Sequence, residues 1–225
     1  MDRIGVNLLS VLDQISQACR RSGRPVEAVK LLAVSKTFPL ECVLQAHAAG
    51  QLLFGENRVQ ELAAKAPQAP ADCQWHLIGH LQSNKVRAAL QYAACIQAVD
   101  SLALLRRIND LATELQCRPT ILLEVNISGE ASKFGLSPEA VEEVVLAARD
   151  GQARCQGLMT VAPLAAAPAE LGKIFAGLRQ LRDKVSAYTG CPLPELSMGM
   201  SGEFPLAIAE GATIVRIGSA IFGNR

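Results

Sequence analysis

Short apolar runs alternate along the chain with longer segments in which apolar residues recur every three or four positions. The apolar runs have the length of strands and cover residues 30–34, 52–55, 75–79, 95–99, 120–125, 155–161, 195–198 and 213–217. The segments between them are rich in good helix formers and cover residues 40–49, 56–66, 83–94, 101–116, 138–149 and 169–187. An amphipathic segment at 4–21 precedes them all. The pattern therefore predicts an opening helix followed by eight strand–helix units.

The spacing of the units selects one architecture. From the first run to the last, the units take 26 residues on average, which is about one strand plus one crossover helix. The runs are too apolar to leave one face in water, and no GxGxxG fingerprint follows the first one. We therefore expect a closed parallel (β/α)8 barrel, the TIM barrel of α/β proteins, with an extra N-terminal helix over 4–21. A length of 225 residues suits a single domain spanning 1–225.

Composition narrows the function classes and the compartment. Lys and Arg number 22 and Asp and Glu 21, so the chain lacks the basic surplus of a nucleic-acid-binding protein. No apolar stretch is long enough to cross a membrane, and no secretion signal opens the chain. The seven cysteines form no CxxC pair and have no zinc-site spacing to the three histidines. We expect a cytoplasmic, monomeric protein with free thiols and no metal.

In a TIM barrel the chemistry lies at the carboxyl ends of the strands. Lys36 follows the first run in the segment AVSKTFP. A lysine over the barrel mouth loses solvation, which lowers its pKa and gives a neutral amine that can form an imine. The alternative is an ordinary solvated loop lysine, since most lysines are exposed.

The loops after the last two runs have the composition of a phosphate site. Ser201 lies beside Gly202 in SMGMSGEF, and Gly218 and Ser219 open a final helix in VRIGSAIFG. Small residues let the backbone approach anionic oxygens, although each segment alone also reads as an ordinary turn. Together with an imine-forming lysine, they suggest pyridoxal 5'-phosphate or the phosphorylated sugar of a class I aldolase.

Arg216 bears on the choice of ligand because it lies within the last run and would point into the barrel. A guanidinium donates hydrogen bonds but cannot accept one, so it would keep a pyridine nitrogen unprotonated and the ring a weak electron sink. The alternative is an ion pair with an inward carboxylate such as Glu124. Asn57 could contact the ring oxygen or cap a helix, His80 would lie at the mouth, and His76 reads as an interior histidine.

Seven blocks, in this order, closely resemble the pyridoxal phosphate homeostasis protein family. They run from about residue 30 to 225 and read AVSKTFP, FGENRVQE, WHLIGHLQSNK, NISGEASKFG, GLMTVAP, LSMGMSGEF and TIVRIGSAIFGNR. The resemblance implies a barrel like the N-terminal domain of alanine racemase. It also implies that Lys36 holds the cofactor as an imine, that Ser201, Gly218 and Ser219 contact its phosphate, that Arg216 faces the pyridine nitrogen and that Asn57 lies at the pocket. The chain departs from the family at Arg58, where Tyr is usual, and at Glu203, where Asp is common.

By the same resemblance we expect a protein that binds, buffers and delivers pyridoxal 5'-phosphate to apoenzymes without robust catalysis. Such a protein would influence the balance of amino acids and keto acids. A slow amino acid racemase with Lys36 as its base is the alternative. The carrier is favoured because the chain ends after the eighth unit, with no second domain to bring a tyrosine base, and because Tyr92 and Tyr188 fall in helical segments.

Overall fold

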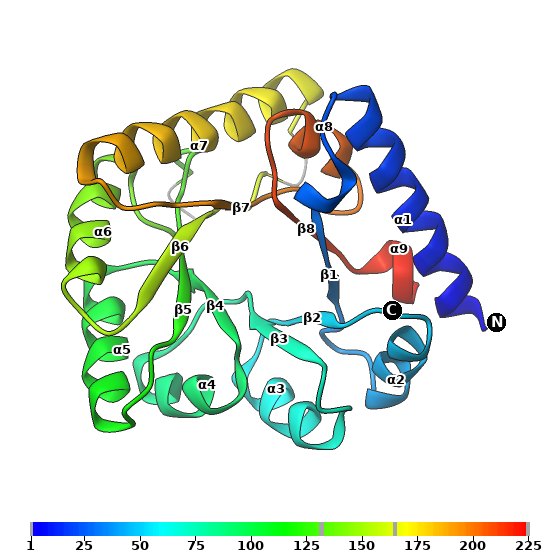
Figure 1. Cartoon of the computed structure of the whole chain (residues 1–225), viewed down its shortest axis with the longest axis horizontal. Helices are drawn as coiled ribbons and strands as arrows, with labels where there is room; N and C mark the ends of the chain where they lie inside the picture. Colours follow the sequence, from blue (N-terminus) through cyan, green and yellow to red (C-terminus); the bar gives the residue numbers. More distant parts are fainter. Residues whose placement is uncertain (1, 131–132, 164–165, 224–225) are drawn as a thin grey trace.

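The computed structural model describes residues 2–130, 133–163 and 166–223. Residues 131 and 132 of the block after the fifth run, and the last two residues of the final block, lie outside this part. Figure 1 shows a central ring of strands with helices around it. Each strand pairs with the next one along the chain, all in parallel, and the eighth pairs with the first to close the barrel. The predicted (β/α)8 architecture is confirmed.

Every predicted apolar run contains a strand. The strands are β1 (Lys30–Val34), β2 (Leu53–Glu56), β3 (Gln74–Leu77), β4 (Cys95–Val99), β5 (Thr120–Glu124), β6 (Arg154–Met159), β7 (Glu195–Ser197) and β8 (Ile214–Ile217). The ends of β1 and β4 agree with the prediction, whereas β3 and β6 stop two residues earlier. The apolar pattern continues past the last ladder partner in those two places, so it overestimates the strand.

Helices cover the outside of the barrel. They are α1 (Arg3–Arg21), α2 (Leu40–Ala48), α3 (Val59–Lys65), α4 (Val86–Tyr92), α5 (Leu102–Glu114), α6 (Val141–Arg149), α7 (Pro168–Thr189), α8 (Phe204–Ala209) and α9 (Ser219–Phe222). Short 3-10 turns lie at Val26–Ala28, Ala66–Gln68, Ser83–Lys85 and Pro138–Ala140. In the described part of the chain, no helix combines the length and the apolar character needed to cross a membrane.

The prediction of a helix over 56–66 is wrong at its start. Glu56 is the last residue of β2, and Arg58 is extended with φ −119° and ψ 131°, so α3 begins only at Val59. Two helical segments also begin as 3-10 turns, at 83 and 138, before they become α-helical. The residue that precedes the turn at 83 is Gln82, whose side chain makes no capping hydrogen bond.

Alternation along the strands separates two apolar layers. One cluster fills the space between strands and helices, and a smaller one, which includes Leu32, Leu122 and Met159, fills the barrel itself. Polar residues share the barrel interior with this smaller cluster. Gln97 and Ser197 are wholly buried there. Ser197 donates a hydrogen bond to the Gln97 amide oxygen, which offsets the cost of burying both polar groups.

Helix α1 covers the flank on which the chain ends. Leu8, Val11 and Ile15 face inward, and α1 packs against α8 and α9, beside the C-terminal end of the described chain (Figure 1). Asp2 caps the helix by accepting a hydrogen bond from the Gly5 amide at 2.7 Å. The predicted N-terminal helix over 4–21 is therefore confirmed, and it supports the two elements that follow β7 and β8.

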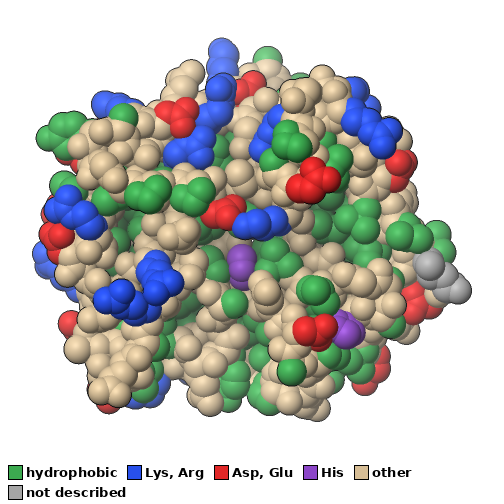
Figure 2. Space-filling model, viewed as in Figure 1, with side chains coloured by type: hydrophobic (Ala, Val, Ile, Leu, Met, Phe, Trp, Pro, Cys, Tyr) green, Lys and Arg blue, Asp and Glu red, His purple; other side chains and the backbone are tan. Residues whose placement is uncertain are grey.

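The surface view shows charges of both signs. Figure 2 shows Lys and Arg scattered among Asp and Glu over the face in view, with no broad area of one sign. This agrees with the formal net charge of +1.

Leu8→Ala tests the packing of α1. Leu8 is wholly buried, so we expect its truncation to lower the free energy of unfolding by about 2–5 kcal/mol. Leu9, the next residue on the same helix, is 48% exposed, and Leu9→Ala should change stability by no more than about 0.5 kcal/mol. Urea denaturation of the two variants measures both values. Equal losses would contradict the packing described for α1.

Candidate functional site

A cavity of about 460 Å³ opens at the carboxyl ends of β1 and β8. Its size falls within the range of small-molecule sites. Five of the six predicted site residues line it, and they are Lys36, Ser201, Arg216, Gly218 and Ser219. Residues far apart in the sequence thus share one cavity.

Strand pairing explains this convergence. β1 and β8 are parallel neighbours, with Leu32 opposite Arg216 and Ala33 opposite Ile217. Parallel strands end at the same rim, so the loop that carries Lys36 and the loop that carries Gly218 emerge side by side. The register sets the height of each group, and Arg216 lies within the barrel below both loops.

The loop after β1 has a strained backbone at Thr37. Thr37 has φ 66°, a left-handed conformation that β-branched residues rarely adopt. Its amide donates to the Glu61 carboxylate at 2.6 Å, and the Phe38 amide donates to the Ser35 carbonyl at 3.1 Å. These bonds hold the loop in a conformation that it would not adopt alone, which is typical of ligand-binding segments.

A buried polar cluster supports the same loop from below. The Lys65 ammonium donates to the Glu56 carboxylate at 2.7 Å and to the Ser35 carbonyl at 2.9 Å. The Ser35 hydroxyl donates to the same Glu56 oxygen at 2.7 Å. Burial raises the pKa of Glu56, and the hydrogen bonds from Lys65 and Ser35 oppose that rise. The residue directly before Lys36 is thereby fixed on both its carbonyl and its hydroxyl.

The opposite wall of the cavity is built from hydroxyl and glycine residues. The hydroxyls of Ser201 and Ser219 lie 3.4 Å apart although they come from the loops after β7 and β8. Gly202 has open space where a side chain would be, while a Cβ at Gly218 would meet the Val34 carbonyl at 3.2 Å. The first amides of α9 have no partner within the helix. This wall offers several donors to an anion.

Glu203 holds the loop after β7. Its carboxylate accepts a hydrogen bond from the Met200 amide at 2.9 Å. Gly199 in the same loop has φ 92°, and a Cβ there would lie 2.5 Å from the Cβ of Ala207. Only glycine fits this position, so the turn brings Ser201 over the cavity.

Arg216 is held by two hydrogen bonds in the barrel interior. Its guanidinium donates to the Ser197 hydroxyl at 2.8 Å and to the Thr160 carbonyl at 2.7 Å. Burial lowers the pKa of Arg216 to about 10, and the negative charge of Glu124 opposes this shift. The side chain is therefore a charged donor at neutral pH. Among the described residues, no ion pair joins Arg216 to Glu124, so the ion-pair alternative is not what holds it.

Glu124 lies at the end of β5 and titrates in the neutral range. Burial raises its pKa to about 7, and the nearby Asp100 charge adds to the rise. The positive charges of Arg216 and His80 act in the opposite direction. Glu124 therefore changes charge near the cavity within the physiological pH range.

Asn57 and His80 line a second cavity of about 490 Å³ rather than the first one. Its other polar residues include Arg58 and Lys85, so both contribute positive charge to this cavity. Asn57 does not cap α3, whose N-cap residue is Arg58. The His80 ring pairs with Asp100 at 2.7 Å and stacks on Phe134 with the ring centroids 4.1 Å apart.

One group of possible metal ligands lies away from the cavity. In the described part of the chain, His47, Asp72 and Cys73 place their ligand atoms within 4.8 Å of one another. The sequence did not indicate this group because His47 is distant along the chain from the other two. Structural zinc sites take four ligands, and His47 already bonds Asp72 at 2.8 Å. The absence of a metal stays a prediction.

Ser197 and Thr160 are the site residues that the sequence did not reveal. Both lie within apolar runs of the sequence, at 155–161 and 195–198, yet they hold the Arg216 guanidinium. Ser197 lies two residues after Glu195 on the same face of β7. From this alternation the hydroxyl could have been predicted to lie inside the barrel. Nothing in the sequence shows that it contacts Arg216.

Known proteins resemble the chain over its whole length. Residues 6–225 match the family described as alanine racemase, N-terminal domain. A pyridoxal phosphate homeostasis protein of Aquifex aeolicus is 40% identical over 97% of this chain and 96% of its own length. A protein of that name from Pseudomonas aeruginosa is also 40% identical, over 100% of this chain and 97% of its own length.

A solved structure agrees with the fold. PipY of Synechococcus elongatus PCC7942, with PLP bound, superposes with a TM-score of 0.85 and is 39% identical. The match covers 98% of this chain and 100% of that one. The same protein without PLP superposes with a TM-score of 0.87.

Glu124→Gln tests the titration near the cavity. The folded-state pKa of about 7 lies above the ordinary value of 4.5, so the stability contributed by Glu124 is full below pH 4.5 and is lost as the pH rises through 7. The variant lacks this loss because its amide stays neutral. We expect the unfolding free energy of the wild type to fall relative to the variant between about pH 5 and pH 8. Parallel curves would show that the group is not perturbed.

Proposed function

We propose that this chain, which belongs to the pyridoxal phosphate homeostasis protein family, binds pyridoxal 5'-phosphate in the cavity between β1 and β8. One observation carries the proposal. Lys36, the hydroxyls of Ser201 and Ser219, and the Arg216 guanidinium line a single cavity, although they come from opposite ends of the sequence. The amine can form an imine with an aldehyde, and the hydroxyls can donate to a phosphate. The fixed guanidinium can donate to a pyridine nitrogen.

The residues fit the cofactor in distinct roles. Lys36 would hold the aldehyde carbon as an imine, and Ser201, Gly218 and Ser219 would contact the phosphate. Gly202 leaves room at this wall, because nothing lies within 4 Å of the place its Cβ would occupy. Arg216 would face the pyridine nitrogen, and Asn57 would contact the cofactor only from the rim, since it lines the neighbouring cavity. When bound, pyridoxal 5'-phosphate supplies an electrophilic imine and an electron-accepting ring.

Two features favour storage and delivery over efficient catalysis. Arg216 stays charged at neutral pH because its pKa is about 10, so it can only donate to the ring nitrogen and leaves the ring a weak electron sink. The described residues that line the cavity include no tyrosine, histidine or cysteine to act as a second base beside Lys36. We therefore assign the chain to cofactor homeostasis: it buffers pyridoxal 5'-phosphate and passes it to apoenzymes, with effects on amino acid and keto acid balance.

The surroundings of the thiols support a reducing compartment. All seven cysteines are unpaired, and burial raises the pKa of the Cys155 thiol to about 12. A thiol in this state is inert, which suits the cytoplasm. We propose a cytoplasmic monomer formed by the single domain 1–225, without nucleic acid or membrane among its partners.

A slow racemase is the second candidate. Lys36 as the only base would have to remove and return a proton on the same face, which retains configuration unless the substrate turns. Glu124, with a pKa of about 7 and a charge that acts on Arg216, and the His80–Asp100 pair are groups that could exchange protons. These groups are the observation that favours a racemase. A class I aldolase is disfavoured because it needs no donor such as Arg216 for a ring nitrogen.

Lys36→Ala should abolish the visible absorption of protein loaded with pyridoxal 5'-phosphate, because no imine can form at that position. Lys30→Ala is the matched control, since Lys30 begins the same strand and pairs with Glu195 at the other end of the barrel. The control should keep its colour. Absorption spectra after gel filtration measure both. Colour in Lys36→Ala, or its loss in Lys30→Ala, would refute the assignment.

The loaded protein should not interconvert D- and L-amino acids at ordinary enzyme rates, which are on the order of 1 to 1,000 per second. Chiral chromatography of alanine and other amino acids after incubation with purified protein checks this. Turnover in that range would replace the carrier with the racemase. A slow activity that disappears in Glu124→Gln, with binding of the cofactor unchanged, would identify the second proton donor.

A further inference from the structure

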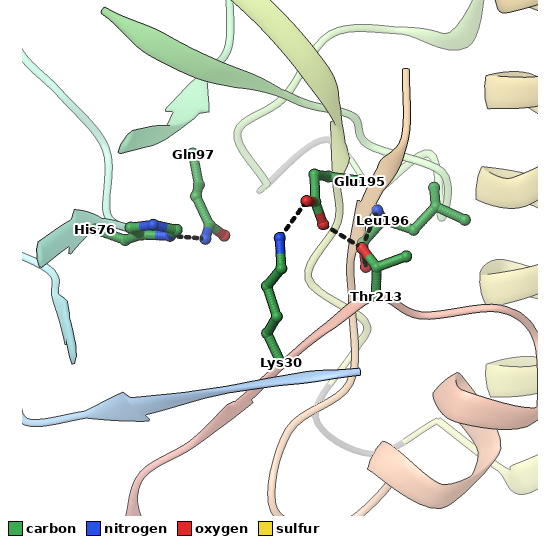
Figure 3. Close-up of polar contacts among 6 residues, drawn as sticks. All are labelled: Lys30, His76, Gln97, Glu195, Leu196 and Thr213. Atoms are coloured by element: carbon green, nitrogen blue, oxygen red, sulfur yellow. Dashed lines mark hydrogen bonds and ion pairs between the residues drawn. The ribbon is translucent and has the colours of Figure 1, made fainter. Parts of the chain in front are cut away.

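Three polar side chains extend from Arg216 through the barrel interior. The Ser197 hydroxyl, which accepts from Arg216, donates to the Gln97 amide oxygen at 2.6 Å. The Gln97 amide nitrogen lies 2.7 Å from Nδ1 of His76. Figure 3 shows His76 and Gln97 pointing toward each other inside the barrel. This series of hydrogen bonds thus leads from β8 through β7 and β4 to β3.

The neighbours of these residues along the chain also lie in or against the barrel interior. Gln97 and Cys95 lie two positions apart on β4, and Ser197 and Glu195 two positions apart on β7, so each pair faces the same side. His76 lies on β3, two positions before Ile78, which follows the end of that strand. Cys95 belongs to the apolar cluster inside the barrel, and Ile78 packs against that cluster. Barrel interiors are usually filled by branched apolar residues, and polar groups there cost stability. A continuous series of hydrogen-bonded polar residues across this core therefore indicates a functional role.

Each bond in the chain has a defined direction. A guanidinium only donates, so the Ser197 oxygen must accept from Arg216. The Ser197 proton is then available to the Gln97 oxygen, which turns the amide NH2 toward His76. His76 must accept this bond on Nδ1 and carry its proton on Nε2. With the amide reversed, two donors would point at the Ser197 oxygen and its own proton would have no acceptor in the chain.

The surroundings of His76 keep it in the accepting state. Burial lowers the pKa of His76 to about 4, and the positive charge of Lys30 lowers it further, against the opposing charge of Glu195. The ring is neutral at physiological pH, so Nδ1 stays an acceptor. His76 also lines a cavity of about 330 Å³ at the amino-terminal end of the barrel, together with Lys30 and Glu195.

We propose that Ser197, Gln97 and His76 are positioning residues that orient the Arg216 guanidinium toward the cofactor ring. The proposal rests on the function proposed above. His76 fixes the amide of Gln97, Gln97 takes the proton of Ser197, and Ser197 is left with only lone pairs to offer Arg216. The Thr160 carbonyl holds the other terminal nitrogen of the guanidinium. Arg216 is thereby fixed at two points, one of which is controlled from the far end of the barrel.

Substitutions at His76 separate this role from simple packing. The side-chain oxygen of Asn lies as many bonds from the backbone as Nδ1 of His, so His76→Asn keeps an acceptor in that place. His76→Leu puts a methyl group there. We expect His76→Leu to shift the visible absorption band of the loaded protein and to raise its dissociation constant for pyridoxal 5'-phosphate roughly two- to tenfold, the value of one hydrogen bond. His76→Asn should keep the wild-type band and affinity.

Thr213→Val is the control for lost stability at the same end of the barrel. Its hydroxyl donates to Glu195 at 2.6 Å and accepts from the Leu196 amide at 2.8 Å, and Figure 3 shows this network apart from the His76–Gln97 pair. We expect it to lower the melting temperature without moving the band. A band that moves equally in Thr213→Val and His76→Leu, or in neither, would overturn the proposal.

The tautomer of His76 tests the direction of the hydrogen bonds between Arg216 and His76, and this test needs no cofactor. The sequence has three histidines, so nitrogen NMR of histidine-labelled apoprotein gives three ring systems, and His76→Asn identifies the relevant one. We expect a neutral ring with its proton on Nε2. A proton on Nδ1 would overturn the proposal even if the protein binds cofactor. Conversely, a colourless wild type with the expected tautomer would refute the cofactor assignment but not the hydrogen-bond directions between Arg216 and His76.

Discussion

The parallel pairing of the first and last strands is the constraint on which the site depends. Closure of the barrel sets β1 beside β8 and aligns Leu32 with Arg216. Lys36 and Ser219, which are separated by most of the sequence, meet only because of this pairing. A change in this register by one residue would turn Arg216 toward the helices and remove the donor from the cavity. The site is therefore a property of the closed barrel rather than of any one loop.

Rigidity of the loop that carries Lys36 has a cost that the core offsets. The strained Thr37 backbone and the buried Lys65–Glu56 pair are each unfavourable alone. They persist because an extensive apolar layer between strands and helices fixes the backbone around them. A site held this firmly suits a protein that keeps a reactive aldehyde bound and protected, since little reorganisation is needed when the ligand arrives.

The sequence predicted the fold and most of the cavity for identifiable physical reasons. Apolar runs of strand length report burial directly, so β1 and β4 agree residue for residue with the prediction. The rule that chemistry follows each strand then located Lys36, Ser201 and Gly218. Asn57 was predicted at the same pocket, whereas in the structure it lines the neighbouring cavity.

The interior hydrogen bonds could not be predicted because they depend on contacts across the barrel. Gln97 and Ser197 are 100 residues apart, and no local pattern pairs them. The same limit applies to Glu124, whose pKa depends on charges from other strands.

Borohydride reduction of the loaded protein, followed by mass spectrometry of its peptides, tests the central claim most directly. The account predicts one stable pyridoxyl phosphate adduct, located on Lys36. An adduct confined to another lysine, or unmodified Lys36 in a fully loaded sample, would contradict it.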